Sequence, residues 1–206
     1  MAFTFFWRDE HVLAHAVRLV APILGGRSRP RIWDAGCAMG QEPYTLCMML
    51  ADSLGRFAFN NLTIHATDMD EQGTFGPIVT AGVYAKGELE RMPAAAFETY
   101  FEPAEKAEHF RVVDRIRSRL LFQKHDLLSL QEIGQNFSLV LCKNVLLHFQ
   151  AAERVEVLRM FDRALVPGGL FATEMTQKMP AEMAPLFEQL VPDAQLFRKV
   201  ETVPCA

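Results

Sequence analysis

The segment that most constrains the fold of this chain is Arg31 to Cys47, RIWDAGCAMGQEPYTLC. Ile32 and Trp33 are typical of the end of a buried strand, and Asp34 to Gly40 form a run of small residues typical of a tight turn. From Gln41 onward, apolar residues recur at helical spacing. A strand, a glycine turn and a helix in this order form the first half of a nucleotide-type binding unit.

The glycines of this turn suit a ligand site, although a purely structural turn is the alternative. Gly36 and Gly40 let the backbone approach a ligand closely, and the following helix start offers unpaired N–H groups. The spacing D-x-G-x-x-x-G, with no Lys-Ser/Thr after it, excludes a Walker-type phosphate loop. One βα unit later, the apolar strand Leu62–Asp68 ends in an acid that can accept from ribose hydroxyls. A ligand with adenosine and no pyrophosphate fits this loop better than NAD does. The pattern therefore favours S-adenosylmethionine.

Composition sets limits on the possible partners. The 206 residues predict a single domain over 1–206, and the net charge of −4 with a pI near 5.9 gives no reason to expect nucleic acid. No apolar run reaches the roughly 18 residues of a membrane span, so we expect no direct membrane insertion. The N-terminus does not have the pattern of a signal peptide. Four cysteines without a C-x-x-C pair suggest free thiols and a cytoplasmic location.

Alternating strand and helix patterns predict an α/β fold with a doubly wound, mostly parallel sheet. Phe137–Cys142 is nearly continuous in apolar residues, which is typical of a parallel strand buried on both faces. It is followed by Lys143 and Asn144, at the carboxyl end of the strand, where open α/β sheets bind ligands.

Two other regions carry weaker predictions. Phe110–Val113 and Arg119–Gln123 both alternate, which predicts a small inserted β-ribbon at about residues 108–123. Near the C-terminus we expect a turn at Pro167–Gly169, a helix near Ala181–Leu190 and an edge strand near Gln195–Val203.

The N-terminal residues Phe3–Asp9 combine four aromatics with one arginine. They either dock the leading segment on the core or wall a ligand. Arg8 is either a site residue or the partner of a neighbouring acid, Asp9 or Glu10. His11 and His15 are four residues apart but lack H-E-x-x-H order, so we expect no metal site.

Several motifs together resemble the catalytic domain of the CheR family of chemotaxis receptor methyltransferases, from Thr4 to about Gly169. The family methylates receptor glutamates with S-adenosylmethionine. The segments that carry the resemblance are Thr4–Asp9 (TFFWRD), Glu42–Thr45 (EPYT), Ala66–Asp70 (ATDMD), Gly82–Tyr84 (GVY) and Phe137–Phe149 (FSLVLCKNVLLHF).

The resemblance implies a Rossmann-like class I methyltransferase fold, with S-adenosyl-L-homocysteine as the product. Thr4 and Arg8 would face the methionyl end and the reacting methyl, and Asp68 would hold the ribose. A chemoreceptor-type or other protein would be the acceptor, with the oligomeric state left open. The residues assigned to the cofactor are Thr4, Arg8, Asp34, Gly36, Gly40, Glu42, Asp68, Asp126, Leu127, Lys143 and Asn144, with Asp126 and Leu127 beside the adenine.

Departures from the family pattern fall mostly on the acceptor side. Lys143 stands where the family has arginine, and His148 where it has tyrosine. Glu174–Gln177 replaces a G-H-S-E motif, and the N-terminal helical domain that usually precedes the catalytic domain is not expected in this chain.

Three functions therefore remain open on the sequence. The first is a protein-glutamate carboxyl methyltransferase, in which Arg8 positions the acceptor and Asn144 and His148 line its side of the site. The second is a methyltransferase for another acceptor, with His148 as a base, since histidine side chains titrate near neutral pH. The third is a cofactor-binding regulatory module without transfer activity.

Overall fold

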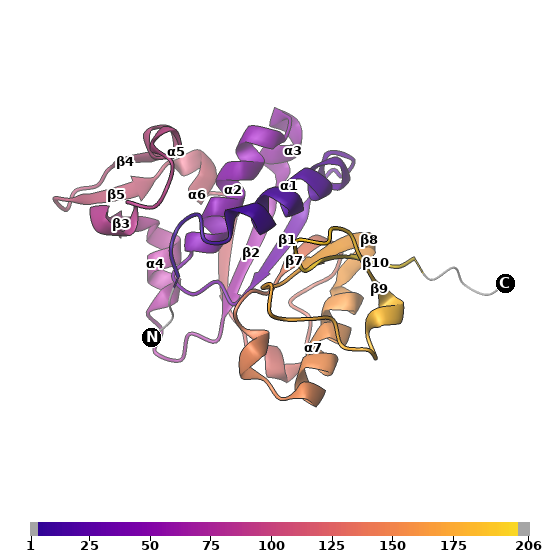
Figure 1. The fold of residues 1–206 in the computed structure, drawn as a ribbon. Coiled ribbons are helices and arrows are strands. Elements are labelled where there is room, and N and C mark those ends of the chain that lie inside the picture. The colour runs from indigo at the N-terminus through magenta and orange to yellow at the C-terminus, as the bar shows by residue number, and fades with distance from the viewer. Residues whose placement is uncertain (1–3, 202–206) are drawn as a thin grey trace.

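A seven-stranded sheet forms the centre of the computed structural model, which describes residues 4–201 (Figure 1). The first five strands in its spatial order are parallel, and the last two are antiparallel to their neighbours. This confirms the predicted mostly parallel α/β sheet. In spatial order the strands are β6 (Leu120–Lys124), β2 (Thr63–Asp68), β1 (Arg31–Ala35), β7 (Phe137–Leu141), β8 (Leu165–Ala172), β10 (Leu196–Lys199) and β9 (Phe187–Gln189).

The two faces of the sheet are covered by different helices because successive strand residues point in opposite directions. Ile32 packs in one core with α1 (Glu10–Gly25) and α2 (Gln41–Ser53). Its neighbour Trp33 packs in a second core with α7 (Ala151–Ala164). Figure 1 shows α1 and α2 on one side of the sheet and α7 on the other. The arrangement is the doubly wound one that the alternating pattern predicts.

The prediction of a β-ribbon at residues 108–123 is wrong about which strands pair with each other. A small antiparallel sheet does exist, but its strands are β3 (Val83–Ala85), β5 (His109–Val112) and β4 (Phe101–Pro103), in that order. The other predicted ribbon strand is β6, which pairs with β2 in the large sheet. Alternation indicates which face of a strand is apolar and not which strand lies beside it.

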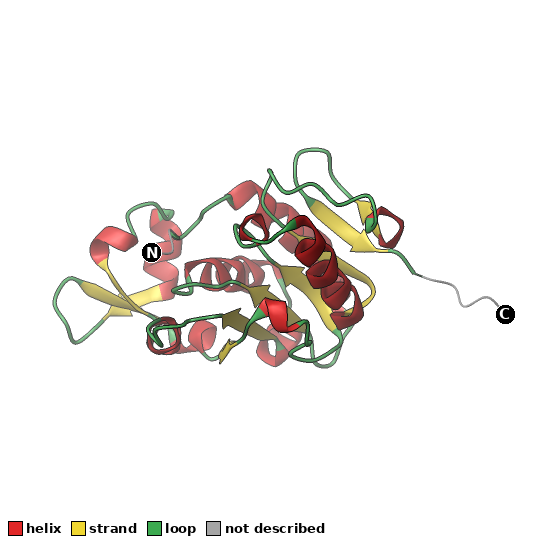
Figure 2. Cartoon of the chain, turned by 90° about the horizontal axis from the view of Figure 1, so that it is seen from below, coloured by secondary structure: helices red, strands yellow, loops and turns green. Residues whose placement is uncertain are grey.

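Short helices connect these parts. They are α3 (Arg56–Asn61), α4 (Phe75–Ala81), α5 (Ala94–Tyr100) and α6 (Asp114–Arg117), with single 3-10 turns at Lys86–Glu88, Leu127–Ser129, Leu146–His148 and Ala184–Leu186. The small sheet lies to one side of the large sheet in both views (Figures 1 and 2).

The C-terminal predictions need correction. The expected helix at Ala181–Leu190 is only a 3-10 turn followed by β9, because Pro185 interrupts a helix. Residues 167–169 lie inside β8, where Gly168 has a φ of 70° and the pairing with β7 is irregular. The expected edge strand, β10, is covered by β9.

Some predictions fall on residues that the structure does not describe, namely Phe3, Cys205 and the end of the predicted edge strand at Val203. Within residues 4–201, the three cysteines Cys37, Cys47 and Cys142 are free and buried. In the same range no helix is long and apolar enough to cross a membrane, and no group of His, Cys, Asp or Glu is arranged to hold a metal ion.

Candidate active site

A cavity of about 370 Å³ lies at the carboxyl ends of β1, β2 and β7. That volume falls within the range of small-molecule sites. All the residues predicted for the site line it except Asp34 and Gly40. The predicted residues in its wall are Thr4, Arg8, Gly36, Glu42, Asp68, Asp126, Leu127, Lys143, Asn144 and His148.

The glycine turn is fixed to β2 by backbone hydrogen bonds. The N–H groups of Gly36 and Cys37 donate to the carbonyl oxygen of Thr67 at 2.7 and 2.9 Å. Gly36 has a φ of 105°, and a Cβ there would lie 2.2 Å from a methyl carbon of Val145. Any side chain at Gly36 would therefore strain the backbone and collide with the opposite wall of the cavity.

Asp68 braces the same turn from the end of β2. Its Oδ2 accepts from the N–H of Ala38 at 2.9 Å, and its Oδ1 accepts from the N–H of Asp70 at 3.2 Å. Ala38 has a positive φ of 46°, so this bond supports a strained position. A carboxylate has capacity for further donors. Asp68 can thus hold the turn and accept from ribose hydroxyls as well.

The two predicted residues outside the cavity wall lie immediately behind it. Gly40, with a φ of 92°, immediately precedes α2, and a Cβ there would lie only 3.0 Å from the side chains of Tyr84 and Val79. Asp34 is buried, and its Oδ2 has no hydrogen-bond partner among residues 4–201. Burial, reinforced by the nearby Glu42, raises the pKa of Asp34 well above its ordinary value.

An ammonium group joins the two sides of the cavity. Lys143 Nζ lies 2.7 Å from Glu42 Oε2 and 3.2 Å from Asp9 Oδ2, and its side chain is 1% exposed. Burial alone would lower the pKa of Lys143, but Glu42 and Asp9 outweigh burial and hold it above its ordinary value. The contact is a single point to each carboxylate rather than the planar fork of an arginine.

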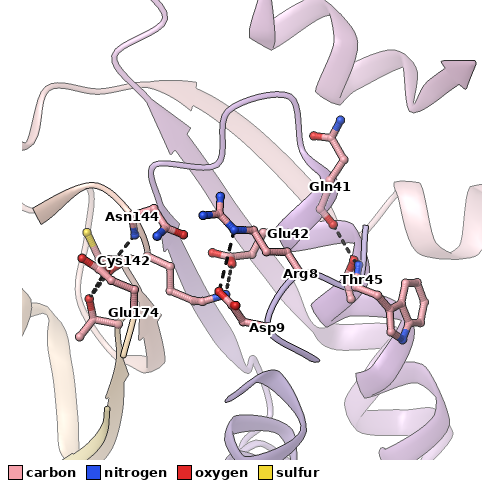
Figure 3. Close-up of polar contacts among 11 residues, drawn as sticks. Arg8, Asp9, Gln41, Glu42, Thr45, Cys142, Asn144 and Glu174 are labelled. Atoms are coloured by element: carbon pink, nitrogen blue, oxygen red, sulfur yellow. Dashed lines mark hydrogen bonds and ion pairs between the residues drawn. The ribbon is translucent and has the colours of Figure 1, made fainter. Parts of the chain in front are cut away.

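The N-terminal arm, residues 4–9, contributes Thr4 and Arg8 to the cavity wall. Phe6 is fully buried, with its ring 4.9 Å from that of Tyr84, so the aromatic cluster docks the arm on the core. Arg8 Nε lies 4.0 Å from Asp9 Oδ2. Arg8 thus lines the cavity and also contacts an acid, Asp9 (Figure 3).

Asn144 and His148 form the remaining side of the cavity. Asn144 has a φ of 60°, and its N–H donates to Glu174 Oε2 at 2.8 Å. Thr173 Oγ1 lies 2.7 Å from the same carboxylate oxygen. Glu174, one of the departures from the family pattern, thus fixes the turn that carries Asn144 (Figure 3). His148 ends the 3-10 turn that follows.

At the other end, Asp126 and Leu127 begin a 3-10 turn beside Asp68. Asp126 Oδ1 accepts from the N–H of Leu128 at 2.9 Å, and Leu127 is buried. The N–H of His125 donates to the carbonyl oxygen of Asp68 at 2.8 Å. This wall offers an apolar surface and backbone groups, as a flat aromatic base requires.

The sequence reasoning missed several residues of the cavity wall and two that act behind it. The missed wall residues lie within two positions of a predicted one, so proximity to a motif was their only signal: Cys37, Ala38, Thr67, Met69, His125, Leu128, Val145 and Phe149. Asp9 was considered only as a partner of Arg8. Glu174 was noted only as a departure, and no local pattern indicated its bond to Asn144.

Comparisons with known proteins agree with this geometry. Residues 2–192 match the family model described as CheR methyltransferase, SAM binding domain. A chemotaxis protein methyltransferase from Listeria monocytogenes is 30% identical over 167 residues, which cover 80% of this chain and 61% of that protein. Chemotaxis protein methyltransferase 1 from Pseudomonas aeruginosa is 31% identical over 188 residues, covering 86% and 67%.

Among solved structures, a TehB-like SAM-dependent methyltransferase from Corynebacterium glutamicum aligns with 89% of this chain and 84% of its own. The TM-score of this alignment is 0.48, at 14% sequence identity. This chain spans less than two thirds of the length of the Listeria protein. The family model, by contrast, matches nearly the whole chain. The chain therefore belongs to the CheR methyltransferase family, in its S-adenosylmethionine-binding domain.

Proposed function

We propose that this chain transfers a methyl group from S-adenosylmethionine to glutamate carboxylates of a chemoreceptor-type protein. The observation that carries the proposal is the meeting of two sets of residues at one cavity. Asp68 and the glycine turn form one wall, and Arg8 on the N-terminal arm and Asn144 form the other.

The residues of the cavity suit this cofactor. S-adenosylmethionine would supply a methyl group on a sulfonium, and its methionyl end carries an ammonium. Three carboxylates line the cavity, those of Glu42, Asp68 and Asp126. Glu42 is paired with Lys143, so Asp68 and Asp126 are the acids left to attract a cationic ligand. Asp68 would hold the ribose, and Asp126 with Leu127 would flank the adenine.

The chain's own residues would act mainly by orientation. A glutamate carboxylate is an anion at neutral pH, so its methylation needs no strong general base. Rate then depends on holding the attacking oxygen about 3 Å from the methyl carbon, in line with the bond that breaks. Arg8 would pair with the acceptor carboxylate, and Asn144 and His148 would line its path.

A methyltransferase for another acceptor is the second candidate, and His148 in the cavity wall favours it. A hydroxyl or amine acceptor needs a base, and an imidazole at this place can serve as one. Such an enzyme would use the same cofactor wall and differ only on the acceptor side.

Transfer of labelled methyl to receptor fragments, followed by mild base, tests the proposal. A glutamate methyl ester releases labelled methanol, whereas N-methyl and ether products do not. Base-stable label would support the second candidate. Cofactor binding by calorimetry without transfer to any acceptor would instead indicate a regulatory module.

A further inference from the structure

The N-terminal arm has an unusual backbone at the two positions that flank Arg8. Trp7 and Asp9 have φ values of 61° and 51°, in the left-handed region that residues other than glycine rarely adopt. Such conformations persist only where the surroundings hold them. The two positions set the direction of Arg8, so whatever holds them also places its guanidinium.

Trp7 is held by a hydrogen bond from its own backbone N–H and by the packing of its neighbour in the core. Its N–H donates to Thr45 Oγ1 of α2 at 3.2 Å. The preceding residue, Phe6, is buried between the rings of Tyr84 and Phe101, at 4.9 and 5.6 Å. These contacts fix the arm on the amino-terminal side of Arg8.

Asp9 is held in a different way. It precedes α1, where an aspartate side chain commonly accepts from the first N–H groups of the helix. Here the side chain makes no such bond, and the backbone carbonyl accepts from the N–H groups of Val12 and Leu13 instead. The carboxylate is 3.2 Å from Lys143 Nζ. The side chain therefore serves the ion pair and not the helix.

We propose that Asp9 is a positioning residue, which holds the arm against Lys143 and so keeps Arg8 directed at the acceptor. This inference rests on the proposed function for the role of Arg8. Lys143 is almost fully buried and is bound to Glu42 in the cavity wall at 2.7 Å, which makes it a fixed anchor. Without the Asp9 carboxylate, Glu42 still neutralises the ammonium, so the cofactor wall keeps its charge balance. Asp9 therefore acts on the arm, while the glycine turn, Glu42 and Asp68 on the cofactor side keep their own contacts.

The variant Asp9→Asn in the full chain tests this inference, with Glu10→Gln as the matched control. Glu10 is the next carboxylate along the chain, is exposed, and lies in the first turn of α1. We expect kcat/KM for a receptor fragment to fall about tenfold to a hundredfold in Asp9→Asn, as for a misplaced reacting group. Cofactor affinity by calorimetry should change less than about threefold, and Glu10→Gln should match the wild type in both. Asp9→Glu, which keeps the charge, should recover part of the loss.

Trp7 supplies a readout that needs no methyl acceptor. The chain has two tryptophans, and Trp33 is fully buried, so acrylamide quenching of fluorescence reports mainly on Trp7. We expect stronger quenching in Asp9→Asn than in Glu10→Gln or the wild type, at an unchanged melting temperature. Equal quenching in all three proteins would overturn the inference, whether or not the wild type transfers methyl. Absence of transfer by the wild type, with the quenching difference present, would overturn the proposed function alone.

Discussion

The two walls of the cavity are built by different kinds of interaction. The cofactor wall is fixed by backbone groups of neighbouring strands, as where Thr67 accepts two N–H groups from the glycine turn. The acceptor wall is fixed by side chains from distant parts of the sequence. Lys143 joins residues 9 and 42, and Glu174 holds the N–H of Asn144. The cofactor wall thus depends on contacts between neighbouring strands and on Asp68, whereas the acceptor wall depends on side chains that are distant in the sequence.

The largest effect is expected on the cofactor wall, from Asp68→Ala. Hydrogen bonds from ribose hydroxyls to a carboxylate contribute about 1.5–3 kcal/mol each. If Asp68 holds the ribose as proposed, two such bonds would be lost, and the N–H of Ala38 would lose its partner. We expect the Kd for S-adenosylmethionine, measured by calorimetry, to rise at least about tenfold while the protein remains folded.

Asp70→Ala is the control for that variant. Asp70 accepts from the N–H groups of Thr74, Phe75 and Gly76 at the start of α4, and does not line the cavity. Its loss should lower the free energy of unfolding by about 1 kcal/mol, as for a lost helix cap, and leave the Kd nearly unchanged. If Asp68→Ala binds the cofactor normally, the ribose assignment is wrong.

On the acceptor wall, Arg8→Ala should affect turnover far more than stability. The guanidinium faces the cavity from an arm that Phe6 anchors independently. We expect kcat to fall about tenfold to a hundredfold, with a melting temperature close to that of the wild type. A variant that keeps full activity but melts early would assign Arg8 a purely structural role with Asp9.

A smaller gain is expected from restoring the family residues on the acceptor wall. Lys143→Arg offers Glu42 a planar fork, and His148→Tyr restores a phenol at the cavity. We expect the wild type to bind the cofactor but methylate receptor glutamates slowly, and the double variant to be faster. A wild-type rate of about 1 s⁻¹ or more on receptor fragments would contradict this decoupling and make both residues neutral variation.

The contrast between the walls also explains how much the sequence could predict. The glycine turn, Asp68 and the strand before Lys143 are local patterns, and each lies where its pattern places it. The partners of Lys143 and Asn144 lie far away in the sequence. The periodicity of a segment does not indicate which distant residues will contact it. The same reason explains the wrong prediction for β6. Its alternation indicated a strand, but did not indicate which strand would be its neighbour in the sheet.

The last prediction uses pH to separate His65, inside β2, from Lys143 on the acceptor wall. Burial, together with Arg31, lowers the pKa of His65 on β2 to about 4. The unfolded chain binds a proton there near pH 6.5, so stability is complete above that value and falls as the pH decreases toward 4. The pKa of Lys143 is raised, so its contribution is complete below about 10.5 and is lost only as the pH rises through the folded value. We expect His65→Gln to reduce the dependence of the melting temperature on pH between pH 6.5 and 4. The decrease of the melting temperature at alkaline pH should stay unchanged. An unaltered acid limb would mean that other groups control the stability of the fold in acid.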